Sequence, residues 1–206
     1  DGFLGRNLRV RIAEVGRDEV LPIGRGSSED DLRRAAGEAD AVVHLAGINR
    51  PPDPADFATG NAGFTERLCA ILAGTGRAPP VLFSSSTQAA LDNPYGRSKR
   101  DAEEALLRYS RDSGAAVHLF RLTNVFGKWS RPDYNSAVAT FCHNVARGLP
   151  VTVHDPAAPL KLVYVDDVVT AFLDVLADPP PGSGFRDAGP VHATTVGAVL
   201  DTIRAV

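Results

Sequence analysis

The sequence predicts an α/β fold built on a doubly wound parallel sheet, and three observations indicate it. Short, continuous apolar segments alternate with segments of helical periodicity along the chain. These apolar segments have few polar interruptions, which is typical of parallel strands covered on both faces. The 206 residues suffice for one domain with a substantial core and are too few for two domains of ordinary size.

The first half of the chain contains three strand patterns and three helix patterns. We predict strands at 18–23, 40–47 and 79–86, and helices at 27–39, 54–76 and 94–114. Ser27 or Ser28 fits an N-cap, with acidic residues in the first turn that follows. The second helix is expected to be irregular near Gly60 and Gly63, and Gly114 can end the third.

The second half repeats the alternation with shorter elements. We predict strands at 115–127, 151–154 and 160–165, and helices at 135–148, 166–178 and 196–206. Asp166 and Asp167 fit the positive dipole end at the start of a helix, which favours them there over a catalytic pair. The Pro- and Gly-rich segment 178–184 is interpreted as a surface loop, so we expect a single domain over 1–206.

Composition excludes several classes of function. A net charge of −3 and a pI near 5.9 argue against a nucleic-acid partner. No apolar run approaches the roughly 18 residues of a membrane helix, and the amino end has no apolar signal region. The two cysteines, Cys69 and Cys142, are expected to be reduced, and the five histidines have no metal-ligand spacing. We therefore expect a cytoplasmic protein without a metal or membrane partner.

The amino end carries part of a glycine motif. Gly2 and Gly5 have the spacing of the last two glycines of G-x-x-G-x-x-G, where backbone approaches a pyrophosphate at a helix N-terminus. No strand pattern precedes them. The sequence thus predicts a Rossmann-like sheet that lacks its first strand, and we expect that the sequence omits residues of a longer protein.

The segment DNPYGRSKR (92–100) carries the strongest chemical signal. Tyr95 and Lys99 are four residues apart and would lie on one face of a helix. An ammonium beside a phenol favours the phenolate and lowers its pKa, so the tyrosine could move a proton at a substrate oxygen. Ser86, at the end of a predicted strand, could hold that oxygen. The alternative interpretation is a surface tyrosine beside a solvated lysine.

Several motifs in this order resemble the extended short-chain dehydrogenase/reductase family, which includes NAD-dependent epimerases and dehydratases. They are Gly-x-x-Gly, VVHLAG (42–47), Asn61, SSS (84–86), Tyr-x-x-x-Lys and RLTNVFG (121–127). Three segments are similar in sequence to the reductase domain of bacterial UDP-2-acetamido-2,6-dideoxy-hexos-4-ulose reductases of capsule and O-antigen synthesis. They are HLAGINRP (44–51), SSSTQAALDNPYGRSK (84–99) and LVYVDDVV (162–169). The resemblance covers nearly the whole chain.

The resemblance implies site residues at matching positions. It implies that Ser86, Tyr95 and Lys99 are catalytic and that Lys99 also holds the nicotinamide ribose. An arginine after the second strand suits a 2′-phosphate, so NADP(H) is favoured and NAD(H) remains possible. The implied cofactor-binding residues are Gly2, Phe3, Leu4, Gly5, Arg25, Asp31, Leu32, Leu45, Ala46, Gly47, Tyr95 and Lys99.

The resemblance also implies a UDP-sugar site and a dimer. The substrate-binding part would be formed mainly from 124–206, and relatives often continue into a cupin-like domain that is absent here. A UDP-sugar carries two negative charges, which suit cationic partners. The implied substrate-binding residues are Asn49, Arg50, Gln88, Asn124, Lys128, Arg131, Asn135 and Lys161. Related enzymes are commonly homodimers through the two helices that include the Tyr-x-x-x-Lys helix.

Three functions remain open at this point. The leading hypothesis is NADPH-dependent reduction of the 4-keto group of the UDP-sugar on the L-talosamine/L-fucosamine route. The second is an NAD-dependent 4-epimerase; a dehydratase is disfavoured because Thr87 and Gln88 stand where that chemistry needs an acid pair. The third is a non-catalytic NADP sensor or scaffold on the same fold. A chain that is inactive as it stands is a further possibility.

Overall fold

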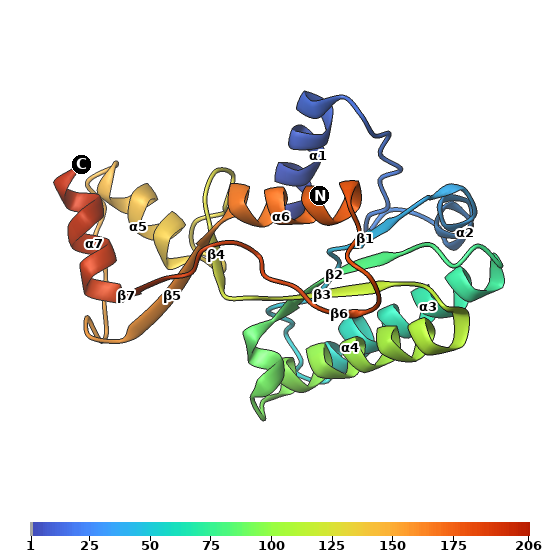
Figure 1. The fold of residues 1–206 in the computed structure, drawn as a ribbon. Coiled ribbons are helices and arrows are strands. Elements are labelled where there is room, and N and C mark those ends of the chain that lie inside the picture. The colour runs from blue at the N-terminus through green and yellow to red at the C-terminus, as the bar shows by residue number, and fades with distance from the viewer. Residues whose placement is uncertain (1) are drawn as a thin grey trace.

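A computed structural model describes residues 2–206 as layers of helices around a parallel sheet (Figure 1). All three neighbouring pairs in the central sheet are parallel. Its strands are β1 (Val42–His44), β2 (Val81–Ser86), β3 (Val117–Leu122) and β6 (Gly184–Phe185), in the order β1-β2-β3-β6. The predicted α/β class with a parallel sheet is confirmed.

Helices cover both faces of this sheet (Figure 1). The helices α3 (Phe64–Gly74) and α4 (Pro94–Ser113) lie on one face, whereas α1 (Phe3–Val15) and α6 (Val165–Ala177) lie on the other. Successive residues of a strand point to opposite faces, so β2 contributes to two separate cores. Phe83 packs in the core beneath α3 and α4, and Leu82 packs in the core beneath α1 and α6.

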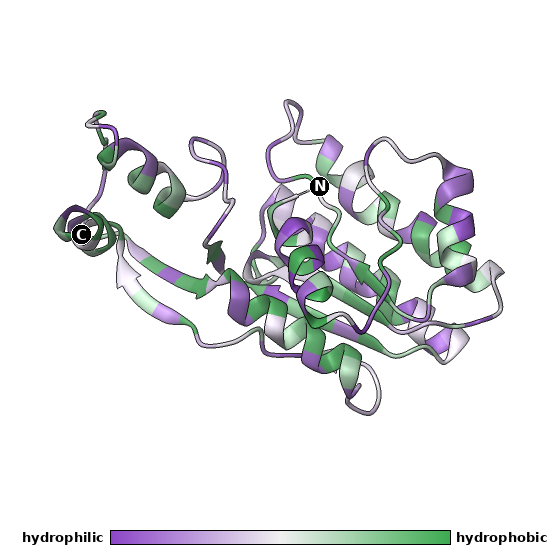
Figure 2. Ribbon diagram, turned by 90° about the horizontal axis from the view of Figure 1, so that it is seen from above, coloured by the Kyte–Doolittle hydropathy of each residue, from purple (hydrophilic) through white to green (hydrophobic). Residues whose placement is uncertain are grey.

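A second, smaller sheet leads away from the first. Its strands are β4 (Asn124–Phe126), β5 (Pro159–Tyr164) and β7 (His192–Thr195), with β4 parallel and β7 antiparallel to β5. The helices α5 (Ala137–Val145) and α7 (Val196–Ala205) lie at its far end, where Figure 1 draws them beside one another. Figure 2 shows that the strands of the central sheet are more apolar than these outer segments.

Two predicted strands do not form. Residues 18–23 are irregular, and Leu21 and Ile23 are exposed. Within residues 2–206 no strand pairs with the outer edge of β1, so no ladder of hydrogen bonds reaches this segment. Residues 151–154 are also irregular and lie in a loop between α5 and β5, where Thr152 and His154 are exposed and Val151 and Val153 are partly buried.

Other boundaries differ because tertiary contacts decide them. The predicted strand 115–127 is divided into β3 and β4, which belong to different sheets. The predicted helix 27–39 is α2 (Glu29–Glu38), begun by a capping box between Ser28 and Asp31. The expected irregularity near Gly60 and Gly63 is a π-helical segment, η1 (Ala58–Gly63), which runs into α3. Sequence analysis did not predict α1, β6 or β7.

The structure also gives the state of the cysteines and the findings on membrane helices and metal sites. Cys69 is buried, Cys142 is exposed, and both are free. In residues 2–206, no helix combines the length and apolarity needed to cross a bilayer. The same residues contain no group of three or more potential His, Cys, Asp or Glu metal ligands.

Candidate active site

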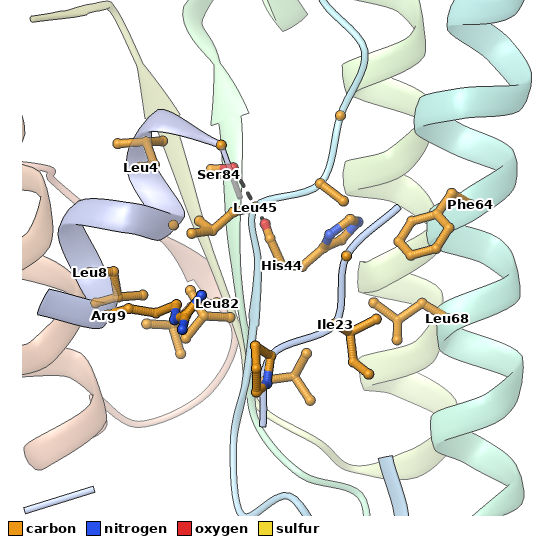
Figure 3. Close-up of a pocket in the computed structure, with 18 of the residues that line it drawn as sticks. Leu4, Leu8, Arg9, Ile23, His44, Leu45, Phe64, Leu68, Leu82 and Ser84 are labelled. Atoms are coloured by element: carbon orange, nitrogen blue, oxygen red, sulfur yellow. Dashed lines mark hydrogen bonds between the residues drawn. The ribbon is translucent and has the colours of Figure 1, made fainter. Parts of the chain in front are cut away.

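An open cleft of about 2200 Å³ runs along the carboxyl ends of β1 and β2. In open parallel sheets, ligands bind beyond these strand ends. The close-up in Figure 3 shows Leu4 and Leu8 of α1 on one side of the cleft and Phe64 and Leu68 of α3 on the other. His44 and Leu45 lie between them, at the end of β1.

Ser86 and Tyr95 both line this cleft, and their side chains are within hydrogen-bond reach of one another. Ser86 is the last residue of β2 and caps the short 3₁₀-helix η2 (Thr87–Ala90), accepting a hydrogen bond of 3.2 Å from the Gln88 backbone N–H. Tyr95 lies in the first turn of α4, which starts at Pro94 behind the N-cap Asn93. Its ring packs against Phe57 with 5.5 Å between ring centroids.

Lys99 points from α4 into the protein beneath Tyr95. Its side chain is buried, and Nζ donates a hydrogen bond of 2.7 Å to the carbonyl oxygen of Ser84. The ammonium lies 4.3 Å from the centroid of the Phe83 ring, a cation–π distance. A methyl group added at Gly47 would lie 3.7 Å from Nζ, so the segment that follows β1 also approaches the ammonium. The structure thus brings the predicted Ser86, Tyr95 and Lys99 to one cleft.

The ionisation of these groups differs in part from the prediction. Burial raises the pKa of the Tyr95 phenol, while the neighbouring Ser86 hydroxyl acts to lower it. The expected lowering of the phenol's pKa by Lys99 is not found, because desolvation dominates at Tyr95 and the ammonium is bound to the Ser84 carbonyl. Burial also lowers the pKa of Lys99 to about 8. Tyr95 is therefore a neutral phenol at pH 7, which suits a proton donor.

Asn61 is a site residue to which sequence analysis assigned no role. It is buried on η1, and its Oδ1 accepts a hydrogen bond of 2.7 Å from the backbone N–H of Ile48. Its Nδ2 donates to Ser98, the residue before Lys99, at 2.9 Å. Asn61 thereby connects the segment after β1 to α4. The motif order contained this residue, but only the fold reveals both of its partners.

Most of the predicted cofactor-binding residues line the cleft. The residues that do so are Gly2, Phe3, Leu4, Gly5, Arg25, Leu32, Leu45, Ala46, Gly47, Tyr95 and Lys99. Gly2 is the N-cap of α1, and it has no side chain to bind the first N–H groups of that helix. Asp31 does not line the cleft, because its carboxylate is engaged in the capping box with Ser28 and in an ion pair with Arg34.

The predicted substrate-binding residues divide into two groups. Those that line the cleft are Asn49, Gln88, Asn124, Arg131 and Asn135. The structure does not bring Arg50, Lys128 or Lys161 to the cleft. Arg50 lies in an exposed bend, Lys128 forms an ion pair of 3.0 Å with Asp166, and Lys161 lies on β5, paired with β7.

Arg6 and Trp129 are a further pair that sequence analysis missed. The Arg6 guanidinium lies 4.7 Å from the centroid of the Trp129 ring. Trp129 itself lines the cleft and has a left-handed backbone conformation with φ of 66°. Nearby, Asn7 donates a hydrogen bond of 3.1 Å to the Lys128 carbonyl, which holds this loop against α1. No sequence spacing signals a contact between segments so far apart.

Comparison with known proteins is consistent with this geometry. A model of the NAD dependent epimerase/dehydratase family matches residues 1–186. The chain is 45% identical over 203 residues to a curated protein of Pseudomonas aeruginosa named UDP-2-acetamido-2,6-beta-L-arabino-hexul-4-ose reductase. This match covers 98% of the chain and 55% of the relative.

Two solved structures are similar in fold. The capsular polysaccharide assembling protein CapF from Staphylococcus aureus is 35% identical, with a TM-score of 0.88 over 98% of this chain and 54% of that one. A UDP-N-acetylglucosamine 4-epimerase from Bacillus cereus is 23% identical, with a TM-score of 0.84 over 99% of this chain and 78% of that one. The chain spans about half the length of the Pseudomonas and Staphylococcus proteins.

Proposed function

Because the chain belongs to the NAD dependent epimerase/dehydratase family, we propose that the protein reduces the 4-keto group of a UDP-2-acetamido-2,6-dideoxy-hexos-4-ulose with NADPH. The observation that carries the proposal is the meeting of Ser86, a neutral Tyr95 and a buried Lys99 at the cleft. The reductase name of the 45% identical relative supports the choice of substrate.

The residues around the cleft fit a dinucleotide. The N-terminus of α1 has no side-chain cap, so its first N–H groups are available to a pyrophosphate. A Cβ at Gly2 would meet no atom within 4 Å, and Gly47 lies between Asn61 and Lys99 without a side chain of its own. When bound, the reduced nicotinamide supplies the hydride for C4 of the sugar.

The protein's own groups handle the oxygen and the proton. Ser86 and Tyr95 donate hydrogen bonds to the 4-keto oxygen and orient the sugar. As negative charge develops on that oxygen, Tyr95 transfers its phenolic proton and the product is an alcohol. Solvent then restores the proton to the Tyr95 phenolate, and the Lys99 ammonium would hold the hydroxyls of the cofactor ribose at the same cleft.

The direct test is consumption of NADPH by the full-length protein with the UDP-4-keto-sugar generated in situ. The proposal predicts loss of NADPH absorbance and one new UDP-sugar with a 4-hydroxyl group. Interconversion of two 4-hydroxy sugars without net NADPH loss would favour the 4-epimerase. Binding of NADPH without any turnover would favour the sensor.

The pH dependence of kcat/KM should follow the ionisation of Lys99. Its ammonium is charged below its pKa of about 8 and neutral above it. We therefore expect kcat/KM to fall roughly tenfold per pH unit above about pH 8. His44 should not contribute an acidic limb, because burial lowers its pKa to about 3. Initial rates across this range check the profile, with circular dichroism as the control for folding. A rate that stays constant up to about pH 10 would contradict this assignment.

We propose that Arg25 selects NADP(H) over NAD(H). It lies exposed in a turn at the edge of the cleft, where a guanidinium can bind a 2′-phosphate. Arg25→Ala is expected to raise KM for NADPH about tenfold and to leave KM for NADH unchanged. Arg34→Ala is the control, since Arg34 binds Asp31 outside the cleft. An equal rise in KM for NADPH and for NADH would contradict the assignment of Arg25 to the 2′-phosphate.

The remaining proposals concern substrate, partner and compartment. We assign the sugar side mainly to residues 124–206, because Asn124, Arg131 and Asn135 reach the cleft from this part of the single domain. A groove of about 540 Å³ between α3 and α4 is the surface to which we assign the homodimer contact. Its lining combines small residues with charged ones: Ala70, Ala73, Ala105, Glu66, Arg108 and Asp112. Free cysteines fit the reducing cytoplasm.

A further inference from the structure

A buried carboxylate lies one helical turn beyond Lys99. Glu103 on α4 has an exposed fraction of 3%. Its Oε1 accepts hydrogen bonds from Ser85 Oγ at 2.5 Å and from Arg121 Nε at 2.9 Å. Its Oε2 accepts one from Arg121 Nη2 at 2.6 Å. The carboxylate is thus bound by a side chain from each of two neighbouring strands.

Stability alone is a weak reason for such a cluster. Desolvating a carboxylate has a large free-energy cost, and a buried ion pair adds little stability relative to apolar residues of similar size. What a bidentate Arg–carboxylate pair does provide is fixed geometry. The position of the cluster in the fold shows which geometry it fixes.

The cluster lies directly behind the active-site groups. Tyr95, Lys99 and Glu103 follow one another at four-residue intervals along one face of α4. Ser85 stands between Ser84 and Ser86 at the end of β2. The carbonyl of Ser84 accepts the Lys99 hydrogen bond, and Ser86 meets Tyr95.

The register of the sheet completes this arrangement. Ser85 on β2 is paired directly with Arg121 on β3, so both side chains leave the same face of the sheet toward α4. Glu103 binds both of them. A single carboxylate therefore fixes the ends of β2 and β3 against the helix that carries Tyr95 and Lys99.

We propose that Glu103 is a positioning residue of the reductase: it holds the end of β2 so that Ser84 and Ser86 face Lys99 and Tyr95, and it supplies a negative charge beside the Lys99 ammonium. This inference rests on the proposed function for its catalytic consequence. The two other roles of Glu103, holding the end of β2 and placing a negative charge beside Lys99, do not depend on which reaction the protein catalyses.

The charges around Lys99 agree with this role. Burial lowers the pKa of Lys99, and Glu103 is the charge that acts against this shift. Arg121 bears the opposite charge to Glu103 and faces it from β3. His44, which faces Lys99 from β1, is neutral at working pH because burial depresses its pKa, and Tyr95 is a neutral phenol.

The test compares Glu103→Gln with Glu104→Gln in the full-length protein. Glu104 is the next residue on α4 and is exposed, so it undergoes the same chemical change away from the cluster. For Glu103→Gln we expect kcat to fall at least about tenfold with KM values within about twofold, and the alkaline limb to move to lower pH. Glu104→Gln should match the wild type in kcat, in the KM values and in the position of the alkaline limb.

A second readout does not depend on activity. NMR of isotopically labelled lysine can follow Lys99, whose signal is assigned as the one missing from a Lys99→Arg variant. In Glu103→Gln the pKa of Lys99 should fall by about one unit. If the wild type lacks reductase activity, the proposed function fails, and this titration still decides the role of Glu103.

A double variant separates positioning from stability. If the single variant unfolds, Glu103→Gln with Arg121→Gln removes both charges, so the partly exposed guanidinium is not left without its partner. We expect its melting temperature to recover while the Lys99 pKa stays low and kcat stays reduced. A wild-type Lys99 pKa in either folded variant, or recovery of kcat together with the melting temperature, would overturn the proposal.

Discussion

Tyr95→Phe is expected to lower kcat/KM for the UDP-4-keto-sugar by at least about a hundredfold, because general acid catalysis typically contributes 10²–10⁴-fold. The change removes one oxygen atom and leaves the ring, so the packing against Phe57 is retained. The phenol is neutral at pH 7, since burial raises its pKa, and it is therefore the proton donor that a forming alkoxide requires. Steady-state NADPH oxidation measures the effect.

Tyr109→Phe is the matched control for this prediction. Tyr109 lies on the same helix and is buried, but it does not line the cleft, and its hydroxyl donates a hydrogen bond of 3.5 Å to the Pro79 carbonyl. It should retain the wild-type rate. If Tyr95→Phe binds NADPH and still turns over within about threefold of the wild type, Tyr95 is not the acid, and the role would pass to another group or to water.

Local signals in the sequence account for the elements nearest the chemistry. The helix predicted over 94–114 is α4, because Asn93 and Pro94 specify its start and Gly114 adopts the left-handed conformation that ends it. The apolar residues Val81, Leu82 and Phe83 likewise indicate a buried strand at β2. Since Tyr95 and Lys99 share one helix and Ser86 ends the adjacent strand, their proximity could be predicted from spacing alone.

Non-local contacts account for what the sequence could not predict. The segment 18–23 has the residues of a strand, but a strand exists only where a partner offers its edge. The division of 115–127 into β3 and β4 depends on which sheet each half joins. Glu103 was missed for the same reason, because Ser85 and Arg121 each lie 18 residues away along the chain.

The approach of η2 to α4 makes Gly96 the glycine whose substitution should cost most near the site. A Cβ at this position would lie 2.2 Å from the Gln88 carbonyl oxygen and 2.8 Å from that of Leu91, and neither backbone atom can rotate away. We expect Gly96→Ala to lower the free energy of unfolding by about 3 kcal/mol, the upper part of the usual range for overpacking. Denaturant unfolding measures it.

The same substitution should also separate Tyr95 from Ser86, because Gly96 follows Tyr95 and its N–H binds the N-cap Asn93 at 2.8 Å. Activity should therefore fall even at temperatures where the variant is fully folded. Gly37→Ala on α2 is the control: nothing lies within 4 Å of the added methyl group, so it should raise stability by about 0.5 to 1 kcal/mol. If the two variants had the same free energy of unfolding, η2 would have moved to make room for the methyl group. The close packing of η2 on α4 would then not determine the distance between Tyr95 and Ser86, which would contradict this prediction.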